Sequence, residues 1–323
     1  MNDKALAAAL VAKGTEFLSR HLPLRAYAEF NWAIALDSTN IAAWKGRAAA
    51  SLEQGHSEEA IFDFTRAIEL DPTDATLWTA RGDAYLENDD PNRAIADYSE
   101  GIRIDARRVQ FYVRRAKAHI FKGEFEQALA DYDQMMRLAP DDPSPYCRRG
   151  EFYFSRNNFE QAIAEFDHAI ALSPKSEYYY QRGSVYTRIS DYRSALADFN
   201  AAIRIEPSSP SAYNARSKVW TALGDRERAN ADYDEAMRLG AIQLGDLYWK
   251  HGAAFEREGS AERAILEFTR AITNYDAVLR IFPHDARLLY RRGMLKRMIG
   301  DDVGGSTDIA AAKAINPKIE SAD

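Results

Sequence analysis

Prolines recur along this chain at a nearly constant distance. Six of them close apolar stretches, at Pro72, Pro140, Pro174, Pro207, Pro283 and Pro317. Successive gaps are 34 or 33 residues, the first gap is twice 34, and only the interval that ends at Pro283 departs from this rule. A fixed period of this length is typical of chains built from stacked repeats, because each short repeat is too small to bury both of its faces alone.

The period divides the sequence into nine repeats that use 313 of its 323 residues. Their bounds are 7–40, 41–74, 75–108, 109–142, 143–175, 176–209, 210–244, 245–285 and 286–319. No room remains for a second domain of ordinary size. We therefore expect residues 1–323 to form one superhelical domain.

The sequence pattern predicts that each repeat forms two helices joined by a turn. In the third repeat, Trp78 precedes the small residue Gly82 by four positions, Asp89 suits the turn, and Ala94 precedes Tyr98 by four positions. Glycine inside a helix costs about 1 kcal/mol relative to alanine. Its recurrence at this slot, or that of another small residue, indicates that a neighbouring helix approaches closely there.

This pattern resembles the tetratricopeptide repeat family over nearly the whole chain. The resemblance implies an all-α fold, an α-solenoid of about 18 antiparallel helices wound into a right-handed superhelix. It also implies that the first helix of each repeat lines a concave groove. A family of this kind predicts a protein-interaction scaffold.

The eighth repeat carries an insertion, because its closing proline, Pro283, comes seven residues late. Seven residues are close to two helical turns, so Tyr275 and Leu279 stay on the same apolar face as Ile265, Phe268 and Ile272. We expect an extended helix over 262–282. Its extra turns either pack on the final repeat or form a contact with a partner or a second copy. The last repeat, 286–319, departs from the pattern around Gly304 and is expected to be a degenerate cap.

Charged residues also follow the period. A basic residue precedes the small slot in nearly every repeat, and a carboxylate stands sixteen residues later. We predict that each pair lies half-buried between the two helices of its repeat, as a structural ion-pair ladder. The ladder includes the pairs Arg81–Asp97, Arg115–Asp131 and Arg149–Glu165.

Patterns typical of catalysis or of metal and phosphate binding are missing from the sequence. It contains no glycine-rich phosphate loop, no G-x-S-x-G, no H-E-x-x-H and no C-x-x-C, and its only cysteine is Cys147. Its six histidines are scattered. We therefore expect no enzymatic activity, no cofactor and no metal site.

The overall charge and hydropathy limit the partners. Lys and Arg number 42 against 49 Asp and Glu, which gives a net charge of -7 and disfavours nucleic acid, whose phosphates need a basic surface. No run of 18 or more apolar residues occurs, so no membrane insertion is expected. We expect a cytoplasmic protein.

The resemblance also implies which residues line the groove and bind a peptide: Lys117, Glu151, Tyr180, Arg188, Asn214, Lys218, Trp249, Lys250, Arg287 and Arg291. Charges of opposite sign on neighbouring helices could instead neutralise each other. The basic members near the C-terminal end favour an acidic or C-terminal segment of a partner protein. The leading hypothesis is a non-catalytic scaffold or adaptor, and the alternative is a regulatory sensor whose superhelix changes pitch when it binds a peptide.

Overall fold

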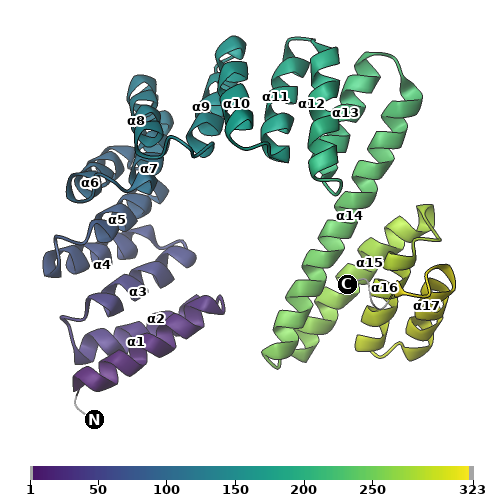
Figure 1. Cartoon of the computed structure of the whole chain (residues 1–323). Helices are drawn as coiled ribbons and strands as arrows, with labels where there is room; N and C mark the ends of the chain where they lie inside the picture. Colours follow the sequence, from purple (N-terminus) through teal and green to yellow (C-terminus); the bar gives the residue numbers. More distant parts are fainter. Residues whose placement is uncertain (1–2, 320–323) are drawn as a thin grey trace. The chain divides into compact units, whose positions relative to one another are not determined.

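The computed structural model describes residues 3–319, and helices joined by short turns make up this range (Figure 1). The described part holds 17 α-helices. They form two compact units, Met1–Phe152 and Tyr153–Asp323. That residues 1–323 form one superhelical domain stays a prediction.

The first unit consists of successive antiparallel helix pairs. Its helices are α1 (Asp3–Ser19), α2 (Pro23–Leu36), α3 (Ile41–Glu53), α4 (Ser57–Leu70), α5 (Ala75–Glu87), α6 (Pro91–Ile104), α7 (Val109–Lys122), α8 (Phe125–Leu138) and most of α9 (Ser144–Ser155).

The second unit begins near the end of α9. Its helices are α10 (Phe159–Leu172), α11 (Ser176–Arg188), α12 (Tyr192–Ile205), α13 (Pro210–Ala222), α14 (Arg226–Arg257), α15 (Ala261–Ile281), α16 (Ala286–Met298) and α17 (Asp302–Ile315).

Local chemistry explains where the helices turn and restart. Asp89 and Gly123 occupy the turns with φ of 58° and 83°, a conformation that glycine and short polar residues tolerate. After the first of these turns, the Asp90 side chain accepts a hydrogen bond from the Arg93 backbone N–H at 3.1 Å, and Pro91 occupies the first helical turn. Proline suits that position because its missing N–H would have no helical partner there.

The small slot and the aromatic slot meet inside several repeats, as expected from the sequence. A Cβ atom at Gly82 would lie 2.7 Å from the ring of Tyr98, and one at Gly183 would lie 2.9 Å from the ring of Phe199. Both rings are buried. The recurrent small residue thus lets the second helix place an aromatic ring directly against the first.

The structure differs from the prediction where the seventh repeat meets the eighth. Helix α14 runs without a break from Arg226 to Arg257, so the predicted boundary at 244/245 lies inside a helix of 32 residues. Two expected helices are fused, which explains why the described residues contain 17 helices rather than about 18. Residues 240–244 hold neither a proline to end the first helix nor a Ser, Thr, Asp or Asn to cap a new one.

Helix α15 has 21 residues and covers nearly the same range as the extended helix predicted over 262–282. Its additional turns duplicate the small–aromatic contact: Cβ atoms at Gly252 and Gly245 would each lie 2.4 Å from a ring, that of Phe268 for the former and that of Tyr275 for the latter. The two aromatic residues are seven positions apart from each other, and so are the two glycines. The inserted heptad therefore lengthens the α14–α15 hairpin by one more layer of core.

Helices α16 and α17 pack unusually closely in the last repeat. A Cβ atom at Gly293 would lie 2.8 Å from the carbonyl oxygen of Gly305, so two glycines face each other where other repeats place a ring. Beside them, Arg292 donates to both carboxylate oxygens of the buried Asp308 at 2.6 and 2.7 Å, and Lys296 approaches the same carboxylate at 2.9 Å.

We predict that acid loosens this last hairpin. Burial alone would raise the pKa of Asp308. The hydrogen bonds from Arg292 and Lys296 together outweigh this effect, so the pKa of Asp308 lies below its usual value. The resulting stabilisation is present above the ordinary carboxyl pKa of about 3.9 and is lost as pH falls through the lower, folded-state value. Hydrogen exchange should show α16 and α17 losing protection as the pH is lowered from about 5 to about 3. Asp308→Asn should weaken this pH dependence, and an unchanged profile in that variant would contradict the prediction.

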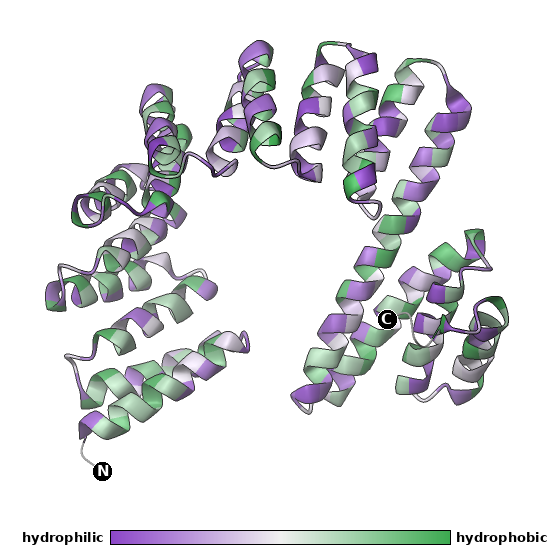
Figure 2. Cartoon of the chain, viewed as in Figure 1, coloured by the Kyte–Doolittle hydropathy of each residue, from purple (hydrophilic) through white to green (hydrophobic). Residues whose placement is uncertain are grey.

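None of the helices within residues 3–319 combines the length and the apolar character that crossing a bilayer requires. Figure 2 shows why: hydrophilic and hydrophobic residues are interleaved along the helices.

Candidate peptide-binding site

The ladder arginines are engaged inside the repeats. Arg81 Nε and Nη2 donate to the two carboxylate oxygens of Asp97 at 2.7 and 2.8 Å. Arg115 donates to Asp131 in the same way, with the shortest contact 2.6 Å. Hydrogen bonding to Asp63 raises the pKa of Arg47, the corresponding arginine of the second repeat. The carboxylates are buried and the arginines are largely so, as expected for pairs between two helices.

Each of these arginines makes a further contact that the sequence analysis missed. Its remaining guanidinium nitrogen donates to a polar residue on the second helix of the preceding repeat, such as Ser99, which lies 3.0 Å from Arg115. The signal was present in the sequence as a short polar residue fifteen or sixteen positions before each arginine. The contacts are Arg47–Asn31, Arg81–Thr65, Arg115–Ser99, Arg149–Asp133, Arg182–Asp167, Arg216–Asn200 and Arg292–Asp276.

The Arg149–Glu165 pair differs from the other two predicted pairs. Arg149 donates to Asp133 at 2.6 Å within the first unit, whereas Glu165 belongs to the second unit. This pair stays a prediction. Because the ladder guanidinium groups are already bound by protein oxygens, the charges that bind a ligand are expected elsewhere.

A cavity of about 250 Å³ lies on the second unit and gathers four of the predicted groove residues. Tyr180 and Arg188 come from α11, and Asn214 and Lys218 come from α13. Its remaining lining residues are Phe154, Ser184, Thr187, Phe199, Ser211 and Ala215. Repeat packing creates this arrangement, because α11 and α13 are the first helices of successive repeats and Phe199 of α12 lies between them in the core.

Charge distinguishes this cavity. Arg188 and Lys218 are both exposed, and neither forms an ion pair with a carboxylate in the part of the chain that the structure describes. No Asp or Glu from residues 3–319 lines the cavity. On its apolar side, the rings of Tyr180 and Phe199 pack with centroids 6.0 Å apart. The cavity therefore offers two available cations beside an aromatic wall.

Sequence reasoning missed several of the lining residues. Ser184 and Thr187 donate their hydroxyl protons to the carbonyls of Tyr180 and Gly183, both at 2.8 Å, and so support the wall of α11 from within. Phe154 stands at the end of α9, outside the slots that the family resemblance assigns to the groove. Only contacts between helices could have placed it beside the other residues.

The other predicted groove residues are not among the residues that line this cavity. Lys117, exposed on α7, and Glu151, half-buried on α9, belong to the first unit. Within the second unit, Lys250 and Arg287 are exposed, but Trp249 packs against the core cluster around α15.

Arg291 is also engaged by the protein itself. Its guanidinium donates to both carboxylate oxygens of Asp246, at 2.7 and 2.8 Å. The hydroxyl group of Tyr275 donates to the same carboxylate. This three-residue contact ties α14, α15 and α16 together, so the charge of Arg291 is compensated within the second unit.

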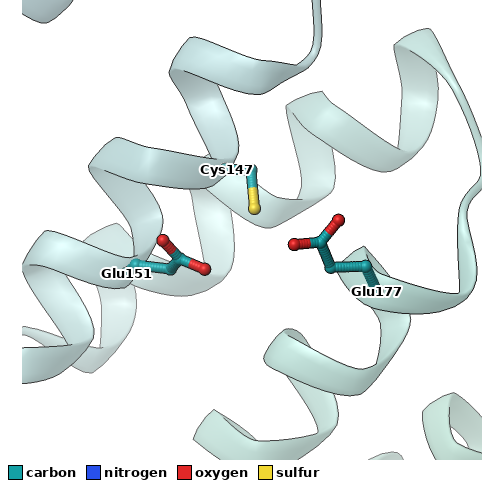
Figure 3. A group of neighbouring side chains, drawn as sticks. All are labelled: Cys147, Glu151 and Glu177. Atoms are coloured by element: carbon teal, nitrogen blue, oxygen red, sulfur yellow. The ribbon is translucent and has the colours of Figure 1, made fainter. Parts of the chain in front are cut away.

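Figure 3 draws Cys147 and Glu151 one helical turn apart on α9. The thiol is buried and both residues belong to the first unit, whereas Glu177, also labelled, lies in α11 of the second unit. Two donors on one helix are fewer than the four ligands of a structural zinc site. The expectation of no metal site stays a prediction.

Successive antiparallel helix pairs with small–aromatic packing define an α-helical repeat protein of the solenoid type. Models described as tetratricopeptide repeats match residues 41–74, 64–96, 115–178 and 176–209. Two of these ranges have the same bounds as repeats read from the proline period. The chain is a tetratricopeptide repeat protein. Proteins with these repeats generally mediate protein–protein interactions, and the repeat scaffold is typically non-catalytic.

Solved structures with the same fold include a tetratricopeptide repeat protein from Parabacteroides merdae. It is 19% identical, with a TM-score of 0.56, over 73% of this chain and 94% of that one. The C-terminal part of a repeat protein from Cytophaga hutchinsonii is 16% identical, with a TM-score of 0.51, over 76% and 97% of the two chains. YrrB, described as having an unusual peptide-binding site, is 19% identical with a TM-score of 0.42 over 55% and 91%. No curated protein matches the sequence significantly.

Proposed function

We propose that this protein is a non-catalytic adaptor that binds an acidic segment of a partner protein in the cavity between α11 and α13. The observation that carries the proposal is the pair of available cations, Arg188 and Lys218, in a cavity that no described carboxylate lines. The predicted groove residues Tyr180 and Asn214 complete the site.

The lining residues suit a peptide carboxylate. Arg188 presents a planar fork of N–H donors and Lys218 a compact ammonium, and both form stronger hydrogen bonds to carboxylates than neutral donors do. The Asn214 amide has both a donor and an acceptor for a peptide backbone. Phe154, Phe199 and the Tyr180 ring supply an apolar surface for a neighbouring side chain. The volume of about 250 Å³ is below the range of about 300–1,000 Å³ usual for small-molecule pockets, which favours the end of a peptide.

Binding of a fluorescein-labelled acidic decapeptide with a free C-terminal carboxylate tests the proposal by fluorescence anisotropy. Arg188→Glu with Lys218→Glu should weaken binding by about tenfold or more, because a hydrogen bond to a charged group contributes about 1.5–3 kcal/mol. The matched control is Arg193→Glu with Arg204→Glu, which changes the net charge equally at two exposed positions of α12. Equal affinity in the two double variants would refute the proposal.

A second peptide locates the recognised group. The same decapeptide with an amidated C-terminus should bind more weakly if the terminal carboxylate occupies the cavity, and equally well if acidic side chains do. The finer expectations of a cytoplasmic location and of a sensor that changes pitch stay predictions.

A further inference from the structure

One aromatic residue is exposed although the equivalent aromatic residues of the other repeats are buried. The aromatic slot of the second helix is buried in Phe30, Phe64, Tyr98, Tyr132, Phe166, Phe199 and Phe268. In the seventh repeat the same slot holds Tyr233, which is 51% exposed, and Met237 one turn later is 56% exposed. The first half of α14 therefore lacks the helix that covers this face elsewhere.

The complementary face is exposed as well. The third position of the repeat, on its first helix, is buried in Ala43, Leu77, Phe111, Pro145, Tyr178, Ala212 and Leu288. In the eighth repeat this position is Leu247, on the second half of α14, and it is 46% exposed.

These two faces are partners in the other repeats. Phe64 of α4 shares a core cluster with Ala84 of α5, and Ile68 shares one with Leu77, the equivalent of Leu247. On α14 the equivalent faces lie on one straight helix, and Met237 is ten residues, or about 15 Å, from Leu247 along its axis. They cannot meet within one chain while α14 stays straight.

They can meet between two chains. The exposed stripe consists of Tyr233, Met237, the half-buried Gly240, Leu244, Leu247 and His251, whose spacings alternate between four and three residues. This order is symmetric about residue 242, so an antiparallel second α14 places Met237 opposite Leu247, Gly240 opposite Leu244, and Tyr233 opposite His251. A Cβ atom at Gly240 would meet no atom within 4 Å, which leaves space for the opposing leucine.

Charge complementarity supports the same register. In the other repeats the ladder arginine also bonds a polar residue on the preceding repeat, as Arg115 bonds Ser99. In the eighth repeat the ladder residue is His251, 3.9 Å from Glu267, and the preceding repeat offers the exposed Asp234. A second chain would bring Asp234 beside His251 and complete this contact in both copies.

We propose that the exposed stripe of α14 binds the same stripe of a second copy of this chain, so that each copy supplies the stacking surface that the other lacks. The eighth repeat of one chain then covers the seventh repeat of its partner, and the reverse. Exchange of equivalent elements between identical chains is an economical route to a symmetric dimer. This contact uses α14 rather than the segment 262–282, which the sequence offered as one alternative for a contact with a second copy.

Paired cysteines test the register. In a Cys147→Ala background, Met237→Cys with Leu247→Cys should form a disulfide-linked dimer under mild oxidation, because the two positions meet across the two-fold axis. Either cysteine alone should not, because equal positions would lie about 15 Å apart along the helix axis, beyond disulfide reach. An intramolecular disulfide, or no disulfide at all, would overturn the proposal.

Light scattering of the unmodified chain gives an independent readout. The expected mass is twice the chain mass of 36.4 kDa. Leu247→Glu should halve it, whereas Leu266→Glu, at a comparably exposed leucine on α15, should leave the dimer intact. A monomeric unmodified chain would show that the stripe serves a different partner or none, and would overturn the proposal. Peptide binding in the cavity between α11 and α13 is a separate measurement and is unaffected by this result.

Discussion

Replacing Arg81 with leucine should lower the free energy of unfolding by about 3–5 kcal/mol, the usual cost of removing one partner of a buried ion pair. Asp97 would keep its negative charge although its side chain is only 7% exposed, and Thr65 would lose the hydrogen bond that it accepts from the Arg81 guanidinium. Guanidinium denaturation followed by circular dichroism measures the loss, and hydrogen exchange locates it in α5 and α6.

The double variant separates the charge effect from packing. Arg81→Leu with Asp97→Leu removes both charges, so it should be more stable than Arg81→Leu alone. The exposed pair Arg66–Glu69 is the matched control, and Arg66→Leu should cost no more than about 1 kcal/mol. If Arg81→Leu and the double variant were equally unstable, the buried charge would not be the cause.

Replacing Tyr275 with alanine should cost about 3–5 kcal/mol, the range for removing a large side chain from a core. Its side chain is fully buried in the α14–α15 hairpin, against Gly245, and its hydroxyl group donates to Asp246. Loss of hydrogen-exchange protection should extend to α16, because Asp246 also accepts from Arg291. Tyr275→Phe keeps the ring and should cost less.

Tyr233, on the neighbouring helix α14, provides the comparison. It occupies the aromatic slot of its repeat but is half-exposed, so Tyr233→Ala should cost much less than Tyr275→Ala. Both changes are best measured in a Leu247→Glu background, which removes the proposed contact between chains. A cost for Tyr275→Ala no larger than that for Tyr233→Ala would contradict the assigned packing.

The parts of the fold that follow from local contacts could be predicted from the sequence. A small residue such as Gly82 and a ring such as Tyr98 are sixteen positions apart, and they belong to the same hairpin. Their recurrence at one period therefore predicts both the helices and their packing. The pairing of Arg81 with Asp97 follows from the same spacing. The burial of the inserted Tyr275 follows instead from its place seven residues, or about two helical turns, after Phe268.

The remaining features depend on what the period does not encode. The fusion of two helices into α14 follows from missing capping residues at 240–244, a local signal that an alignment on prolines overlooks. Lys218 and Arg291 look alike as basic residues in groove slots. Only the structure shows that Asp246, 45 positions earlier, holds Arg291 while Lys218 stays available. Sequence spacing does not reveal contacts over such separations.

The spacing of the ladder contacts has a consequence for the order in which the chain folds. Nearly all of them join residues sixteen positions apart, so each can close soon after its repeat leaves the ribosome, with little loop entropy to overcome. The contacts of the long hairpin reach further: Arg238 to Asp285 spans 47 positions and Asp246 to Arg291 spans 45. We expect the α14–α16 region to become protected more slowly after its own synthesis than the earlier repeats do.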